Sequence, residues 1–251
     1  YSSAVYGNDW TNTATISNNG TAATLANYRG STLTNSGTIS NAGTGAVIVA
    51  ASSNSLSLIN QAGGRIATAG ATAIQSDSGI SLVNSGIIVG DIASTAGQFS
   101  YHSSSIDNAA GTITGNVRLG AGNDTLLVGY ANGAIRTGIS GTIDGGAGTD
   151  TLRVRFTGDT TLSSALALPT NFEQLTLAPD AKTTATLANG FAVAGPLRVG
   201  GSGAIVNTTA LSGTGTILSD EFGSSGSPSV TNAGRITGTG GQSGTFAVAL
   251  N

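Results

Sequence analysis

Short segments of the chain alternate apolar and polar residues, and the same segment returns at a nearly fixed interval. Each holds a leucine, isoleucine or valine, then an asparagine two positions later, then a glycine and an isoleucine. Alternation of this kind places every second side chain on one face of a β-strand. The segments are Leu33–Ile39, Leu58–Ile66, Leu82–Ile88, Ile106–Ile113 and Val230–Ile236.

The asparagines of the first four segments, Asn35, Asn60, Asn84 and Asn108, are 25, 24 and 24 residues apart. A fixed period of this length indicates a solenoid, in which each rung buries its apolar face against the next. We predict an all-β fold, a right-handed parallel β-helix (β-solenoid) of roughly ten rungs, with about 24 residues in each. The handedness follows from the general rule for parallel crossovers.

The asparagines share a face with the leucines, so we expect them to point inward. A buried amide is costly unless it is hydrogen-bonded, and identical amides one rung apart satisfy one another as a ladder. The glycine that follows each asparagine is expected to supply a positive φ at the corner. These glycines are Gly37, Gly63, Gly86, Gly111 and Gly234.

Between residues 115 and 200 the repeated segment is no longer recognisable. The period continues, however, in steps of 26, 23 and 22 residues between Leu126, Leu152, Leu175 and Leu197. No linker interrupts the chain, so we predict a single domain over 1–251. Residues 1–20, with three aromatic side chains, are expected to cap the N-terminal end, and ordinary terminal coil is the alternative. Residues 21–118 form regular Asn-Gly rungs, and 119–251 form less regular rungs with Gly-Asp loops.

Composition narrows the function. Charged residues make up only 8% of the chain and the net charge is −3. Without a basic stripe, nucleic acid is not expected as a partner. The chain has no cysteine, which excludes disulfides and zinc–thiolate sites. No apolar run approaches the ~20 residues that span a bilayer. A Ser/Thr/Asn/Gly-rich, cysteine-free composition is typical of secreted bacterial surface proteins.

Two glycine-rich segments resemble a calcium-binding nonapeptide. Gly145–Arg153 matches the pattern G-G-x-G-x-D-x-apolar-x, and Gly120–Leu126 matches it less well. Asp124 and Asp150 are therefore candidate calcium ligands. The two copies lie 26 residues apart instead of nine, however, and their neighbours are uncharged. The alternative is that both are turn residues, and no other cofactor is expected.

Loops that leave a repeat scaffold are the usual binding places. The segment 94–105 contains Phe99, Tyr101 and His102, and we predict that these three residues form a contact loop. The segment Gly223–Pro228 is similar to the nucleophile segment of trypsin-like proteases, with Ser225 as the nucleophile. Ser224 replaces the family's aspartate there, and His102 is the only histidine, so a plain loop is expected.

Enzymes built on β-helices that cleave glycans group carboxylates on one face. The candidates in this chain are Asp144, Asp150, Asp159, Glu173 and Asp180. They occur one or two to a rung, with no close pair at strand spacing. We therefore expect no enzymatic activity and keep a polysaccharide-active enzyme as the less favoured alternative.

Several phrases together resemble the passenger domains of bacterial autotransporters, the pertactin-like and adhesin-like parallel β-helices. They are the Leu-x-Asn-x-Gly-x-Ile repeat and the segments 120–126, 143–152, 171–177 and 211–217. The resemblance implies a secreted rod on the outer surface of a Gram-negative bacterium. It extends to the scaffold only, so no functional residue is carried over.

Two functions remain open at this point. In the first, the protein is an adhesive or structural surface protein that binds glycans or proteins of host or sister cells. In the second, it is a self-assembling subunit of an extracellular filament or sheath. Unpaired strands at the ends of a solenoid favour assembly, and the alternating segment 244–251 has no charged cap.

Overall fold

The computed structural model describes residues 4–6, 9–29, 32–50, 56–95, 103–213, 217–220 and 228–238. Within these residues the secondary structure consists of β-strands without any helix. The strands are parallel and stack as a β-solenoid of about eight turns, with about 24 residues per rung. This confirms the predicted fold, with somewhat fewer turns than expected.

The chain divides into two compact units. Unit 1 comprises Tyr1–Leu126 and Thr137–Asp150, and unit 2 comprises Leu127–Arg136 and Thr151–Asn251. The first division therefore falls eight residues after the predicted change from regular to less regular rungs at 118/119. The single-domain organisation stays a prediction.

Unit 1 is built from columns of stacked parallel strands, one strand from each rung. The first column follows the order β1 (Ala4–Tyr6), β4 (Leu25–Arg29), β7 (Ile48–Ala50), β9 (Arg65–Ser76), β11 (Ile87–Ser94), β14 (Val117–Arg118) and β17 (Ile143–Asp144). The second follows β2 (Trp10–Asn12), β5 (Thr32–Asn35), β8 (Leu56–Asn60), β10 (Ile80–Asn84) and β12 (Ser105–Asp107). The third contains β3 (Thr15–Asn18), β6 (Thr38–Asn41) and β13 (Thr112–Thr114), joined through β9 and β11.

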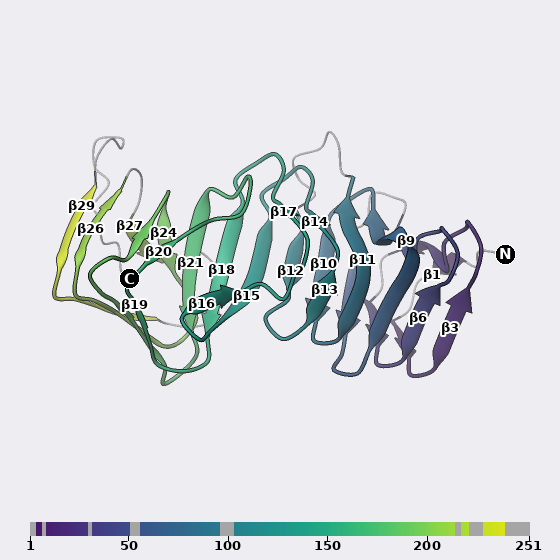
Figure 1. Cartoon of the computed structure of the whole chain (residues 1–251), viewed down its shortest axis with the longest axis horizontal. Helices are drawn as coiled ribbons and strands as arrows, with labels where there is room; N and C mark the ends of the chain where they lie inside the picture. The colour runs from purple at the N-terminus through teal and green to yellow at the C-terminus, as the bar shows by residue number, and fades with distance from the viewer. Residues whose placement is uncertain are drawn as a thin grey trace. The chain divides into compact units, whose positions relative to one another are not determined.

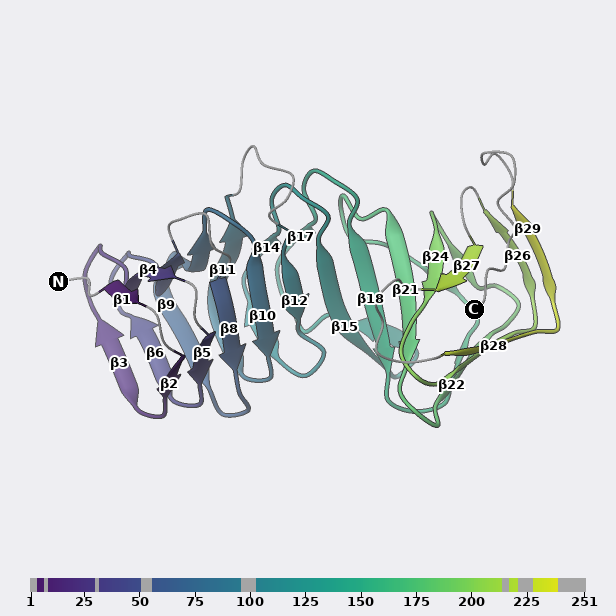
Figure 2. The same cartoon turned by 180° about the vertical axis from the view of Figure 1, so that it is seen from behind.

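Figure 1 shows β6, β9 and β11 side by side, and Figure 2 shows β8, β10 and β12 from behind. Within a column the register is strict, because Leu33 lies opposite Leu58 and Leu58 opposite Leu82. These leucines are 0–1% exposed. The alternation read from the sequence therefore assigns the inward face of these strands correctly.

The predicted asparagine ladder is present and starts one rung earlier than expected. Each Nδ2 donates to the Oδ1 of the asparagine in the next rung, over 2.7–2.8 Å. The ladder runs through Asn12, Asn35, Asn60, Asn84 and Asn108. All five side chains are buried. A column of equal amides thus removes the penalty for placing a polar group in the core.

The ladder has a direction, since every amide donates toward the C-terminal side. At the far end Asn108 Nδ2 donates to the carbonyl of Thr137 at 2.7 Å. At the near end Asn12 Oδ1 accepts the backbone N–H of Ala14 at 3.2 Å. Both ends of the ladder are therefore satisfied by main-chain groups.

The corner glycines have a different role from the one predicted. Of the five, only Gly63 has a positive φ, of 87°. At Gly37 a Cβ would lie 2.1 Å from the carbonyl oxygen of Ala14 in the preceding rung. At Gly86 it would lie 2.2 Å from the oxygen of Gly64. The expectation of a left-handed corner is thus wrong for most rungs, because close approach of the neighbouring rung is what requires glycine.

The corner after the ladder asparagine varies in length between rungs, but the strands that follow it still pair in register. Asn35 and Thr38 are three residues apart, whereas their partners Asn60 and Arg65 are five apart. The extra residues include Gly63, where a Cβ would meet nothing within 4 Å. The insertion therefore bulges outward and leaves the flanking strands in place.

The N-terminal residues join the first rung. Trp10 pairs with Leu33 and Asn12 with Asn35, so this segment is a rung of the usual kind. Tyr6 lies in β1, which pairs with β4. The sequence analysis began the repeat at Leu33–Ile39 and missed this rung, because Trp10 stands where the later segments have leucine or another aliphatic residue.

Unit 2 contains its own columns of parallel strands. Its longest column in the described residues follows β18 (Thr151–Phe156), β21 (Gln174–Pro179), β24 (Leu197–Val199) and β27 (Ile217–Asp220). A second follows β19 (Thr160–Leu162), β22 (Thr184–Leu187), β25 (Ala204–Asn207) and β28 (Ser229–Asn232). Two pairs complete it, β20 (Ala165–Leu166) with β23 (Ala192–Val193) and β26 (Ala210–Gly213) with β29 (Arg235–Gly238).

The leucine period of unit 2 is confirmed by register, since Leu152 pairs with Leu175 and Leu175 with Leu197. A second, short asparagine ladder joins Asn207 Nδ2 to Asn232 Oδ1 at 2.8 Å. The phrase at Val230–Ile236 is thus a true rung, and its partner Asn207 escaped the sequence analysis because Thr209 replaces the corner glycine.

One hairpin interrupts the parallel order. β15 (Thr125–Ala131) pairs antiparallel with β16 (Ala134–Arg136). The turn residues Asn132 and Gly133 have φ values of 54° and 77°. Asn-Gly with two positive φ values is the preferred two-residue hairpin turn, so this element was readable from the sequence and was missed.

The asparagine ladder predicts a large and local effect on stability. Asn60→Ala removes the ladder partner of Asn35 Nδ2 and of Asn84 Oδ1, which keep only main-chain contacts at 3.2–3.4 Å. Each buried hydrogen bond lost in this way costs about 1–3 kcal/mol. We expect the free energy of unfolding in urea to fall by roughly 2–5 kcal/mol. The exposed turn residue Asn19 is the control, and Asn19→Ala should change it by less than about 0.5 kcal/mol. Equal losses for the two variants would contradict the ladder's role.

Candidate functional site

The two candidate calcium ligands lie in stacked loops of unit 1. Asp124 directly precedes β15 and Asp150 directly precedes β18. Between the loops Ala121 forms a parallel bridge with Ala147. A Cβ on Gly146 would lie 1.8 Å from the carbonyl oxygen of Gly120. The loops are therefore in direct backbone contact, and all four glycines of the two Gly-Ala-Gly segments have positive φ values of 94–140°. Both features explain why the sequence repeats Gly-Ala-Gly at the two places.

Both carboxylates point inward and accept hydrogen bonds from the rung before them. Asp124 Oδ1 accepts the backbone N–H of Ser104, and Asp150 Oδ1 accepts that of Asp124 at 2.7 Å. Ser104 extends the column, because its Oγ accepts the N–H of Ile80 at 3.3 Å. Asp124 and Asp150 are 1% and 0% exposed. This column is a carboxylate counterpart of the asparagine ladder.

The environment of Asp124 favours its protonated form. Burial raises the pKa of the Asp124 carboxyl to about 7, the neighbouring charge of Asp150 adds to the rise, and the hydrogen bonds from Ser104 oppose it. Asp124 Oδ2 is buried and accepts no hydrogen bond from the described residues. When this carboxyl is protonated, the proton is therefore expected on Oδ2, because no hydrogen-bond donor already occupies that oxygen.

The arrangement offers little to a calcium ion. Calcium takes six to eight oxygen ligands, and the described residues include no group of three or more His, Cys, Asp or Glu side chains that could hold a metal. One oxygen of each carboxylate is already bound to a main-chain N–H. Calcium binding by Asp124 and Asp150 stays a prediction, and the proposals below do not depend on it.

The raised pKa of Asp124 predicts a pH-dependent stability. The folded state holds a proton that the unfolded chain releases near pH 3.8. The stabilisation is therefore complete below pH 3.8 and is lost as the pH rises toward 7. A shift of this size corresponds to about 4 kcal/mol at most.

We expect Asp124→Asn, which keeps the acceptor for Ser104 N–H, to be more stable than the wild type at pH 8. The difference should shrink as the pH falls to 4. The measurement is the melting temperature of both proteins across this range, with Asp107→Asn as a control for the loss of one carboxylate. A wild-type advantage that grows above pH 7 would show that Asp124 is ionised and stabilising.

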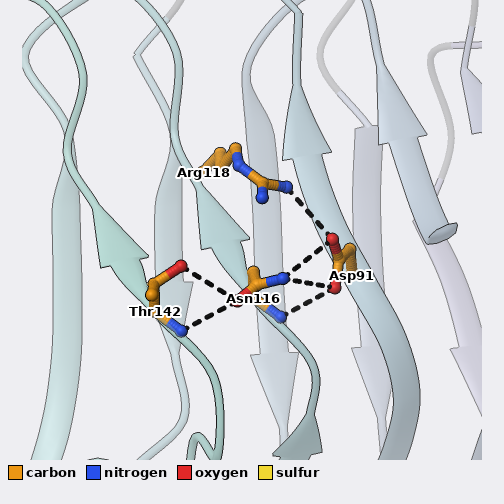
Figure 3. A network of polar contacts seen from close by, with 4 residues as sticks. All are labelled: Asp91, Asn116, Arg118 and Thr142. Carbon is orange, nitrogen blue, oxygen red and sulfur yellow. Dashed lines mark hydrogen bonds and ion pairs between the residues drawn. The ribbon is translucent and has the colours of Figure 1, made fainter. Parts of the chain in front are cut away.

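A second polar cluster lies at an outer corner of unit 1, and the sequence analysis missed it. Figure 3 shows Asp91, Asn116, Arg118 and Thr142. Asp91 Oδ1 accepts the backbone N–H of Asn116 at 2.9 Å, and Asn116 Nδ2 donates to both oxygens of Asp91 at 3.0 and 3.1 Å. Arg118 Nη1 donates to Asp91 Oδ2 at 3.0 Å.

The cluster continues to the next rung. Asn116 Oδ1 accepts both the N–H and the Oγ1–H of Thr142, each at 2.9 Å. Burial alone would raise the pKa of Asp91, but the hydrogen bonds from Asn116 and Arg118 outweigh it and hold the pKa below its usual value. Asp91 therefore stays ionised and fully engaged, which is the state of a structural carboxylate and not of a general base.

The same contact recurs at other corners. A side-chain oxygen of one rung accepts the backbone N–H of a residue 23–26 positions later, which is usually threonine. The described pairs are Asp9 with Thr32, Asn123 with Thr149 and, in unit 2, Asp159 with Thr184, at 2.7–2.9 Å. The spacing of Asp or Asn to Thr by one rung was visible in the sequence and could have identified these contacts.

From the cluster in Figure 3 we predict that the Asn116 amide contributes more to the free energy of unfolding than the ion pair between Arg118 and Asp91. Asn116→Ala removes contacts to two rungs and should lower the free energy of unfolding by about 1–3 kcal/mol. Arg118→Ala should lower it by less than about 1 kcal/mol, because the Arg118 side chain is 50% exposed. Urea unfolding of both variants measures the difference. A larger loss for Arg118→Ala would reverse this assignment.

The remaining predictions concern the contact loop, Ser225 and the candidate glycosidase carboxylates. Phe99, Tyr101, His102 and Ser225 lie outside the described residues, as does segment 244–251. Among the candidate glycosidase carboxylates, Asp144 accepts the N–H of Gly146 at 3.1 Å. In unit 2 Asp180 pairs with Arg155 at 2.9 Å. Asp144 thus serves a turn and Asp180 a surface ion pair, and the expected lack of enzymatic activity stays a prediction.

Comparison with protein-family models, with curated proteins and with solved structures found no match for this chain. The fold and the motifs are therefore the basis of the functional argument. In the part of the chain that the structure describes, no helix is long and apolar enough to cross a membrane.

Proposed function

We propose that this chain is the β-solenoid scaffold of a secreted bacterial surface protein with an adhesive or structural role, of the type found in autotransporter passengers. The fold is consistent with that class, and the motifs in 120–126, 143–152 and 171–177 resemble it. The proposal rests on one observation, which is how the buried polar side chains are hydrogen-bonded. In the described residues they bind the neighbouring rung in columns, which builds a regular scaffold.

The outward faces support a role in contact and not in chemistry. Several stacked positions in unit 1 carry small hydroxyl side chains, such as Thr32 with Ser57 and Ser81 with Ser105. Neutral hydroxyl faces offer hydrogen bonds to glycans or proteins without strong electrostatic selection. The scaffold keeps such positions in register, so a ligand would meet a regular surface with loops at its corners.

The test measures adhesion directly. Beads coated with the purified chain are washed over host epithelial cells, sister bacterial cells and immobilised glycans, and the retained beads are counted against albumin-coated beads. We expect retention on at least one of these surfaces. The triple variant Phe99→Ala, Tyr101→Ala and His102→Ala should lower retention about tenfold, since aromatic side chains dominate contact energies.

A matched control uses Val83 and Ile87, two large apolar side chains that are exposed by 43% and 44% in the described part of unit 1. Val83→Ser with Ile87→Ser should leave retention unchanged, and both variants should melt like the wild type. Retention lost only in this control would place the contact on the strand face. Beads that bind no better than albumin beads on all three surfaces would refute the adhesive role.

A further inference from the structure

The first rung of unit 1 carries alanine at two corners where the next rung carries glycine. Ala14 occupies the position of Gly37, because the flanking pairs are Asn12 with Asn35 and Thr15 with Thr38. Ala22 occupies the position of Gly45, between the pairs Asn18–Asn41 and Leu25–Ile48. The substitution thus occurs at two separate corners of one rung.

At both corners the missing Cβ of the glycine faces the preceding rung. A Cβ on Gly37 would lie 2.1 Å from the carbonyl oxygen of Ala14, and one on Gly45 would lie 2.4 Å from that of Ala22. Carbon and oxygen cannot approach so closely, and backbone cannot move aside as a flexible side chain can. Neither glycine has a positive φ, so an alanine there fails through the contact and not through its backbone conformation.

Unit 2 shows the same contact. A Cβ on Gly234 would lie 2.1 Å from the carbonyl oxygen of Thr209. Thr209 itself has a Cβ. In the rung that precedes it, the backbone follows a different path through the corner. There Leu187 lies opposite Asn207, and Phe191 N–H donates to the carbonyl of Ala188 at 3.0 Å. Thr209 therefore carries a Cβ at this corner because the preceding rung turns differently.

We infer that Ala14 and Ala22 close the N-terminal end of unit 1 to a further rung with the same corners, whether from a second copy of this chain or from added sequence. Both alanines are exposed, and their Cβ atoms occupy the space that the carbonyls of such a rung would need. A segment that packs on this end needs turns with a different backbone path from those of the regular rungs. The turn at Leu187–Phe191 in unit 2 is an example of such a path. This inference is independent of adhesion and disfavours filaments that grow through this end.

Two glycines at equivalent positions of successive rungs, Gly20 and Gly43, provide the first test. A Cβ on Gly43 would lie 2.4 Å from the carbonyl oxygen of Gly20, whereas a Cβ on Gly20 would meet its nearest atom at 3.5 Å. We expect Gly43→Ala to lower the melting temperature by about 5 °C or more and Gly20→Ala to change it by less than about 2 °C. Equal losses would mean that a rung with the same corner already covers Gly20, which overturns the inference.

The second test adds a rung. A copy of residues 26–48 replaces the residues before Ala4, in the register of the Ala4–Ala26 pair, in the wild type and in the Ala14→Gly, Ala22→Gly variant. Amide hydrogen exchange of the added residues is measured in both. We expect exchange at least about tenfold slower in the glycine variant, where the rung can stack. Equal exchange in the two backgrounds, fast or slow, would overturn the assignment of the alanines as the block.

Discussion

Parallel backbone pairing holds neighbouring rungs about 4.8 Å apart, and this spacing decides which side chains each corner accepts. A polar side chain that points inward finds its partners in the neighbouring rung or in the turn of its own rung. A Cβ that points along the axis meets the carbonyl of the neighbouring rung, as at Gly37 and Gly234. The asparagine columns and the corner glycines are therefore two results of one constraint.

The polar columns satisfy this constraint with different donors. In the asparagine ladder side chains bind side chains, whereas in the column of Ser104, Asp124 and Asp150 main-chain N–H groups bind side-chain oxygens. An amide supplies both a donor and an acceptor, so its column is complete. A carboxylate supplies acceptors only, and Asp124 Oδ2 is left buried without a donor from the described residues. Burial raises the pKa of the Asp124 carboxyl, so we expect the carboxylate column to respond to pH and the amide column not to.

The sequence predicted what depends on side-chain alternation and missed what depends on distances between rungs. The inward face of Leu58 and Asn60 follows from a period of two, and the structure confirms it. The role of Gly37 did not follow, because a glycine required by a close carbonyl reads the same as one required by a positive φ. The clustering of Asp91, Asn116 and Thr142 was missed for a related reason, since these residues are 25 and 26 positions apart and had to be compared one rung at a time.

The variable corner after the ladder asparagine has a consequence for how such a chain changes during evolution. Asn35 and Thr38 are three positions apart and Asn60 and Arg65 are five apart, yet both strands that follow remain paired. Insertions at this corner are absorbed outside the core, whereas one residue added within β8 would turn its whole apolar set outward. Length differences among descendants of such a gene should therefore collect at the corners, where new surface can be gained without altering the interior.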